Sequence, residues 1–267
     1  MSGLYIPDFS EILECAECMG QNSEAPELWA GLVGLWPFAV GGGLTAFDVS
    51  GYGNHGTLTN MDPATDWVMT ERGWALAFGG ADACVDIPML VLSTNADSTI
   101  AWWGTRNADG DHAIAGSRAD YKRIMWLDSN DELFIETDTN ANQASSSSQP
   151  SSYDGLWHHA AIVTRAGEAF FYFDGADVGQ GTYTAKLTNT TTIEVFGADK
   201  IGAPSYEYNG RLNNICAWPT RALLPSEISQ LYSDPWAMYR LRSKPFPAAV
   251  APGGIVVPWH LLLQGAA

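Results

Sequence analysis

Two carboxylates near the middle of the chain are spaced as a catalytic pair would be. Glu136 and Asp138 lie two residues apart, and residues two apart on a strand project from the same face. Retaining glycosidases use two carboxylates about 5–5.5 Å apart, a separation that such a pair can reach. However, the pair stands where a short apolar run passes into a serine-rich segment. We therefore favour two solvated loop carboxylates over a hydrolytic pair, and we do not expect an enzyme.

The histidines are the next candidates for metal or acid–base chemistry. His158 and His159 are adjacent on a predicted strand, so their rings should point to opposite faces and cannot hold one ion together. His159 shares its face with Trp157, and we expect a core or rim histidine with its hydrogen bonds satisfied. Neither His55 nor His112 has neighbours at a spacing that defines a metal site.

The four cysteines give no stronger signal. Cys15 and Cys18 form a lone CxxC pair, without the βαβ setting of a redox motif or the second ligand pair of a zinc site. We expect free thiols there and at Cys84 and Cys216. The sequence also lacks a Ser-His-Asp order, a phosphate-binding loop and an HExxH helix.

A glycine-rich stretch near residue 50 offers oxygen atoms to a cation. Asp48, Ser50 and Asn54 carry the kinds of oxygen that calcium binds. The same side chains close turns by bonding to their own backbone, while the glycines between them adopt left-handed conformations. We favour the turn and expect no cofactor, with calcium as the alternative.

Composition and charge narrow the ligand classes. The formal net charge of −17 argues against nucleic acid and membrane surfaces, because binding to phosphate needs a basic face. No stretch reaches the roughly 20 apolar residues of a membrane helix, and residues 1–20 lack the pattern of a signal peptide. Exposed aromatic rings stack on sugars, and Trp103, Trp126 and Tyr121 are possible contributors, but the core needs so many aromatic residues that none is singled out.

The elements that would position these residues centre on residues 156–174. Apolar residues alternate on both faces of two runs, which predicts a hairpin of strands buried on both sides. The turn falls at Arg165–Glu168, where Gly167 is free to adopt positive φ. We place this hairpin at the centre of a sandwich core.

The rest of the chain reads as short strands with one late helix. Strands are predicted at Ser98–Thr105, His112–Ala115, Arg123–Leu127, Glu132–Glu136, Thr192–Phe196 and Arg211–Trp218. The serine-rich segment Thr137–Tyr153 is predicted to be a long mobile loop, and a helix begins at Pro225. The absence of a βαβ rhythm indicates an all-β fold, an antiparallel two-sheet jelly-roll sandwich with one short late helix and extended terminal arms.

Two arms are expected to flank the sandwich of residues 31–240. Residues 1–30 form an N-terminal arm with a short amphipathic helix, and residues 241–267 form a proline-rich C-terminal arm in which no regular element is expected. Apolar residues on both arms need a surface to cover them. The candidate partner-binding residues are Phe9, Ile12, Leu13, Met19, Trp259, Leu261 and Leu262.

Several segments, in order, resemble the laminin-G-like, concanavalin A-like jelly-roll domains. The segments are GLVGLWPF at 31–38, DVSGYGNHGT at 48–57, ALAFGG at 75–80, LWHHAA at 156–161, YFDG at 172–175, GRLNNI at 210–215, RAL at 221–223 and EISQLY at 227–232. The sequence departs from the family at Asn213, where Asp is frequent and contributes to a calcium site. It also departs at Leu224, where a serine usually caps the helix.

The resemblance implies a binding or spacer module. Such domains occur on enzymes, adhesins and virus particles, so the fold leaves the function open. Because the chain shows no export signal and both arms need partners, we expect a non-enzymatic structural or decoration protein of a phage-like particle, located in the virion and contacting other subunits, including copies of itself. The alternatives are an extracellular carbohydrate-binding module and, less favoured, a glycoside hydrolase.

Overall fold

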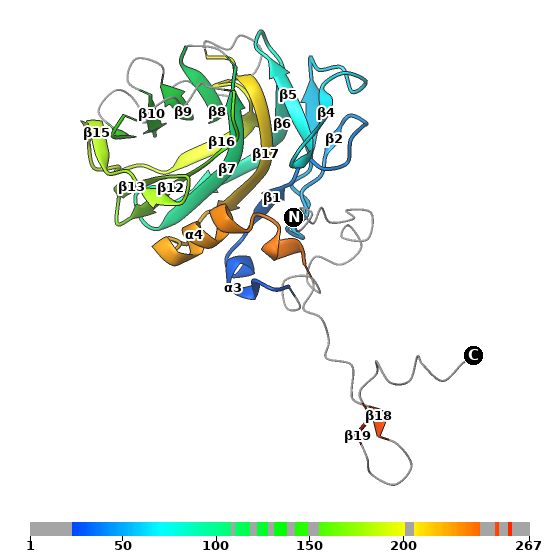
Figure 1. The fold of residues 1–267 in the computed structure, drawn as a ribbon. Coiled ribbons are helices and arrows are strands. Elements are labelled where there is room, and N and C mark those ends of the chain that lie inside the picture. Colours follow the sequence, from blue (N-terminus) through cyan, green and yellow to red (C-terminus); the bar gives the residue numbers. More distant parts are fainter. Residues whose placement is uncertain are drawn as a thin grey trace.

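The computed structural model describes most of the chain, with gaps. It describes residues 23–107, 110–117, 122–127, 131–137, 142–148, 155–200, 206–240, 249–250 and 256–257. The residues lie mainly in two large antiparallel sheets, stacked face to face (Figure 1). The predicted all-β, two-sheet sandwich is confirmed.

One layer is an eight-stranded sheet. Its strands run in the order β14 (Ala176–Asp177), β13 (Glu168–Phe173), β12 (His158–Arg165), β7 (Ser98–Arg106), β17 (Asn209–Trp218), β5 (Gly73–Gly79) and β4 (Trp67–Thr70), with β1 (Gly34–Trp36) also pairing with β17. The middle of the sheet is therefore β7 and β17. The predicted central hairpin lies towards one edge, because only the short β14 follows β13.

The second layer is a nine-stranded sheet. Its order is β15 (Gln180–Thr184), β11 (Gln143–Ser146), β10 (Glu132–Glu136), β9 (Arg123–Leu127), β8 (His112–Gly116), β16 (Thr191–Phe196), β6 (Cys84–Leu92), β3 (Gly56–Thr59) and β2 (Thr45–Ala46). β11 contradicts part of the predicted loop at 137–153. Its serines are buried because they bond to neighbouring strands: Ser146 Oγ accepts from Leu133 N–H at 2.9 Å and Ser145 Oγ from Tyr183 N–H at 3.0 Å.

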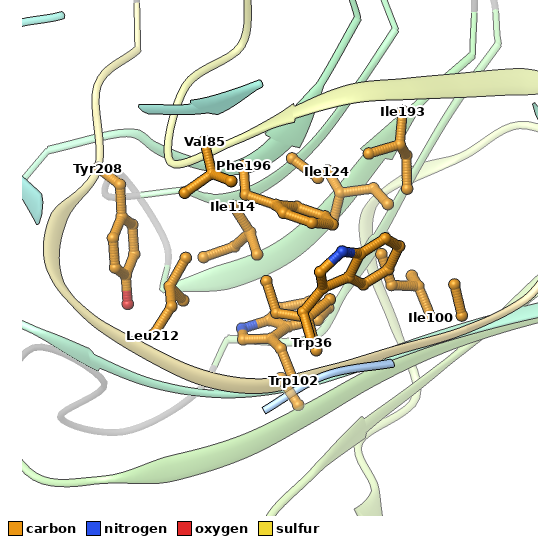
Figure 2. Close-up of a cluster of buried hydrophobic side chains, with 14 of the residues drawn as sticks. Trp36, Val85, Ile100, Trp102, Ile114, Ile124, Ile193, Phe196, Tyr208 and Leu212 are labelled. Atoms are coloured by element: carbon orange, nitrogen blue, oxygen red, sulfur yellow. The ribbon is translucent and has the colours of Figure 1, made fainter. Parts of the chain in front are cut away.

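The main core fills the space between the two sheets. Trp102 and Ile100 from the eight-stranded sheet meet Ile114 and Phe196 from the other, and Trp36 packs edge-on against Phe196 with ring centroids 4.8 Å apart (Figure 2). A second apolar cluster lies on the opposite face of the eight-stranded sheet, under the helices. The strands of this sheet are therefore buried on both faces, as the alternation in residues 156–174 predicted.

Three short helices cover that outer face: α3 (Pro26–Trp29), α4 (Pro225–Ser233) and the 3₁₀ turn η1 (Ala237–Tyr239) (Figure 1). The serine cap missing from α4 is replaced by Glu227, whose Oε2 accepts from Leu224 N–H at 2.8 Å. None of the helices that the structure describes is long and apolar enough to cross a membrane.

The predicted arms differ in how far they fall within the described residues. Residues 23–30 pack on the domain, where Trp218 Nε1–H donates to Leu28 O at 2.8 Å. In the C-terminal arm, β18 (Ala249–Val250) pairs with β19 (Val256–Val257), so the expectation of no regular element is wrong for these four residues. The candidate partner-binding residues Phe9, Ile12, Leu13, Met19, Trp259, Leu261 and Leu262 lie outside the described residues.

Candidate binding site

Three neighbouring strands place one polar–aromatic row on the outer face of the eight-stranded sheet. Trp103 on β7 is the register partner of His159 on β12 and of Asn213 on β17. Side chains alternate between the two faces along a strand, and Trp102 and Ile162 point into the core between the sheets. Trp103 and His159 therefore point to the opposite, outer face of the sheet. Trp103 is only 5% exposed and His159 only 1%. Trp103 is therefore not the exposed sugar-stacking residue that the sequence suggested.

Arg72 lies on this row. It occupies the two-residue turn between β4 and β5, where its N–H donates to Thr70 Oγ1 at 3.1 Å and Gly73 takes a φ of +91°. The guanidinium carbon lies 3.5 Å from the centroid of the Trp103 ring and 5.9 Å from that of Trp157. Both distances are within the range of cation–π attraction.

Tyr232, at the end of α4, completes the group. Its ring stacks on Trp103 with centroids 5.7 Å apart and an interplanar angle of 15°, and it lies 6.3 Å from the His159 ring. Gly175 allows this approach, because a Cβ there would lie 2.8 Å from Tyr232 Cδ1. We call Arg72, Trp103, Trp157, His159 and Tyr232 the arginine–tryptophan cluster.

Asp174 borders the cluster without pairing with Arg72. One oxygen of Asp174 lies 2.8 Å from His158 Nδ1, and the other accepts from His159 N–H at 2.9 Å. His158 stacks on Phe173 of the core, whereas His159 faces the cluster, so the two rings point to opposite faces as predicted. Both oxygens of the carboxylate therefore help to hold the start of β12.

The cluster contains two groups with shifted pKa values. Burial lowers the pKa of His159 to about 3, an effect that Asp174 opposes and Arg72 strengthens. Burial also lowers the pKa of Arg72 to about 10, against the opposing influence of Glu71, Asp174 and Tyr232. At neutral pH the cluster therefore holds a neutral imidazole beside a charged guanidinium.

Buried polar atoms without a partner concentrate in this cluster. Within the described part of the chain they include Nε and Nη2 of Arg72, Nε1 of Trp103, Nε1 of Trp157, Nδ1 of His159 and Oδ1 of the adjacent Asn213. The expectation that His159 is fully satisfied is wrong, because Trp103 and Tyr232 surround its ring with aromatic surface. Buried polar groups without partners are rare in folded proteins, and a cluster of them needs an explanation.

The carboxylate pair considered for hydrolysis is not an open site. Glu136 is fully buried on β10, so the solvated-loop interpretation is wrong for it; Gln143 Nε2 donates to its Oε1 across the sheet at 2.6 Å. Asp138 lies outside the described residues, as do Tyr121 and the side chain of Trp126.

The glycine-rich stretch near residue 50 forms the turn that its sequence favoured. Asp48 Oδ1 accepts from Leu35 N–H and Ser50 N–H, and Oδ2 accepts from Asn54 N–H and Ser50 Oγ, each at 2.9 Å. A carboxylate has about four such acceptor positions, so the turn uses all of them. Asn213, at the other position linked to calcium, donates instead to Trp74 O at 2.7 Å.

The other described histidines and cysteines are hydrogen-bonded or buried as parts of the fold. His55 Nδ1 accepts from Asp48 N–H at 3.0 Å, and His112 Nδ1 lies 2.7 Å from Glu207 O. Cys84 and Cys216 are buried free thiols, as expected, and burial raises the pKa of both. Cys15 and Cys18 lie outside the described residues, and within those residues no three His, Cys, Asp or Glu side chains gather as metal ligands.

Arg72 and Tyr232 are the members of the cluster that sequence reasoning missed. Arg72 stands in a Glu-Arg-Gly turn that looks solvated, and Tyr232 entered the sequence analysis only as the last residue of the EISQLY segment. Trp157 and His159 were assigned to one face, and the structure agrees, because Arg72 lies near the Trp157 ring and on Trp103, whose ring is 5.3 Å from that of His159. No local spacing links residues 72, 103, 157 and 232.

Solved structures share the fold at low identity. Domain 4 of AbnA, a GH43 extracellular arabinanase from Geobacillus stearothermophilus, solved in complex with arabinotriose, is 18% identical with a TM-score of 0.55, covering 75% of this chain and 98% of that one. The binding domain of Paraclostridial Mosquitocidal Protein 1 is 16% identical with a TM-score of 0.56, covering 77% and 52%. A mutant Trypanosoma rangeli sialidase displaying trans-sialidase activity is 15% identical with a TM-score of 0.55, covering 86% of this chain but only 38% of its own.

The sequence comparisons agree with the architecture. No curated protein sequence matches this chain. A family profile, that of the concanavalin A-like lectin/glucanases superfamily, matches residues 78–229, which is more than half of the chain and contains β7, β12, β17 and the first part of α4. The resemblance to laminin-G-like domains is thereby confirmed, and the chain belongs to the concanavalin A-like lectin/glucanases superfamily, with a lectin-like sandwich fold.

Proposed function

We propose that this protein is a non-enzymatic glycan-binding module that binds sugar at the arginine–tryptophan cluster. The observation that carries the proposal is the concentration of unpartnered buried donors and acceptors beside the exposed ring of Tyr232. Sugar rings offer hydroxyl groups for such atoms and apolar C–H faces for stacking on aromatic side chains. The arabinanase domain solved with arabinotriose supports this class of ligand for a sandwich of this shape.

A binding role fits the cluster better than hydrolysis. Glu71 and Asp174 are the carboxylates that act on Arg72, and both oxygens of Asp174 are engaged. Glu136 lies on the other sheet and is buried. A glycosidase needs two carboxylates facing one glycosidic bond, and Glu136 belongs to a different layer from Asp174.

Tyr232→Ala should weaken glycan binding at least about tenfold without unfolding the chain. Tyr232 is 39% exposed, so its ring can contribute to stacking at little structural cost. A stacking contact of about 1.4 kcal/mol corresponds to a factor of ten in affinity. The measurement is calorimetric titration of the purified chain with a panel of neutral and acidic oligosaccharides that includes arabinotriose.

Tyr183→Ala is the matched control for this titration. Tyr183 is 40% exposed but packs on Phe134 on the outer face of the nine-stranded sheet. If Tyr183→Ala lost binding and Tyr232→Ala kept it, the site would be on the other sheet. If no oligosaccharide bound the unmodified chain, the proposed function itself would fail.

A second candidate, display on a phage-like particle, rests on where the flanking segments leave the sandwich. Glu24 N–H donates to Arg240 O at 2.8 Å, and the Arg240 side chain pairs with Glu24 at 2.6 Å. Residues 1–22 and 241–267 therefore both continue from one place beside α3 and η1, on the layer opposite the nine-stranded sheet. Because both arms leave the domain at one place, they could together anchor the sandwich to other subunits of a virion. The alternative location is an extracellular surface.

Limited proteolysis with light scattering tests this display candidate. We expect the full chain to associate into species larger than a monomer, and clipping near residues 22 and 241 to leave a monomeric core. Both arms would then be the parts that join subunits. A full chain that resists cleavage and stays monomeric at all concentrations would contradict arm-mediated assembly.

A further inference from the structure

The unpartnered atoms of the arginine–tryptophan cluster are mainly hydrogen-bond donors. Arg72 Nε and Nη2, Trp103 Nε1 and Trp157 Nε1 donate and cannot accept. Asn213 Oδ1 is an acceptor, and His159 Nδ1 takes either role according to its tautomer. A ligand that satisfies this set must bring more acceptors than donors.

The free edge of Arg72 has the geometry of a carboxylate site. Nε–H and the neighbouring N–H of Nη2 point in parallel from one side of the planar guanidinium, and this fork matches the two oxygens of a carboxylate. Both of these nitrogens are buried without a partner in the described part of the chain. A neutral hydroxyl can accept from one arm of the fork, whereas a carboxylate accepts from both.

The charge of Arg72 is not balanced by a paired carboxylate. No ion pair joins Arg72 to another described residue, and Asp174 is occupied by His158 and His159. The guanidinium instead lies over an aromatic ring, 3.5 Å from the centroid of Trp103. A buried charge without a partner is costly, and an incoming anion would offset that cost.

We infer that the cluster recognises the carboxylate of an acidic glycan, of the uronic or sialic acid class, with Arg72 as the bidentate donor and Tyr232 beside the sugar ring. This inference rests on the proposed glycan-binding function and names its ligand class. The Nε and Nη2 edge of Arg72 would bind the carboxylate of the ligand. The indole N–H groups of the tryptophans would donate to other oxygens of the same ligand.

Titration with matched ligand pairs tests the inference. The probes are oligogalacturonate against its methyl ester, and sialyllactose against its methyl ester, so that the two members of each pair differ in the carboxylate that is offered. We expect at least one acidic probe to bind about tenfold or more tightly than its neutral counterpart. Arg72→Gln and Arg72→Lys should each reduce this preference, because Gln lacks the charge and Lys lacks the fork.

Arg165→Gln is the control, since Arg165 also lies on an aromatic ring of this sheet, 5.0 Å from the centroid of Phe170. It should keep the preference for the acidic probe. Equal binding of acidic and neutral probes, or a preference that survives Arg72→Gln, would overturn the carboxylate assignment while leaving glycan binding intact. Displacement by acetate at the affinity of the acidic glycan would overturn the glycan assignment, and binding of neither probe class would refute the proposed function.

Discussion

Asp48→Ala is expected to destabilise the fold by about 3–5 kcal/mol. The substitution leaves the N–H groups of Leu35, Ser50 and Asn54 without their acceptor, and a buried unpaired donor costs about 1–3 kcal/mol. Leu35 lies on β1, which pairs with the central strand β17, so the loss reaches the middle of the eight-stranded sheet. The free energy of unfolding from urea denaturation gives the measurement.

Asp62→Ala provides the comparison for Asp48. Asp62 accepts from Ala64 N–H at 2.9 Å in an exposed turn, where water can replace the carboxylate, so its loss should cost less than about 1 kcal/mol. Similar small losses at both positions would show that the turn near residue 50 does not hold β1. Running each denaturation with calcium and with EDTA should give the same stability, because Asp48 has no acceptor position left for a cation.

Acid should destabilise the protein through His159. Its pKa is about 3 in the folded state against 6.5 for an ordinary histidine, with burial as the main cause. Between these values the unfolded chain binds a proton that the folded chain does not, so stability is complete above pH 6.5 and falls as the pH drops towards 3. Each pH unit in that window costs about 1.4 kcal/mol, which amounts to roughly 2–3 kcal/mol at pH 4.5.

The His159→Gln variant isolates this effect. Glutamine does not titrate, so the difference in unfolding free energy between the unmodified chain and the variant should shift by roughly 2–3 kcal/mol from pH 7 to pH 4.5. Denaturation curves at several pH values supply the comparison, and an NMR titration of the imidazole gives the folded pKa directly. A difference that does not depend on pH would mean that His159 titrates normally and is not held in its aromatic surroundings.

The fold was predictable because alternation is a local property. Residues 156–174 alternate over two runs, and the structure places strands there with a two-residue turn in which both Ala166 and Gly167 have positive φ. β11 was not predictable in the same way, because Ser145 and Ser146 are polar and become buried only through bonds to Tyr183 and Leu133 on neighbouring strands. Partners that lie on other strands leave no signal in the local sequence.

The candidate site was predictable only in part. The opposite orientations of His158 and His159 follow from strand geometry and are confirmed. The approach of Arg72 to Trp103 depends on the register of β5, β17 and β7, which no spacing reveals. The burial of Glu136 also depends on its neighbours, because a carboxylate at the end of a strand looks solvated until Gln143 is placed opposite it.

The measurement that tests the central claim most directly is an NMR titration of the tryptophan side-chain N–H resonances. Trp103 and Trp157 have unpartnered indole N–H groups in the cluster, whereas Trp218 donates to Leu28 O in the apolar cluster under the helices. On addition of the tightest-binding oligosaccharide, we expect the resonances of Trp103 and Trp157 to shift and that of Trp218 to stay in place. Saturable binding that leaves both Trp103 and Trp157 unchanged would contradict the assignment of the arginine–tryptophan cluster as the glycan-binding site.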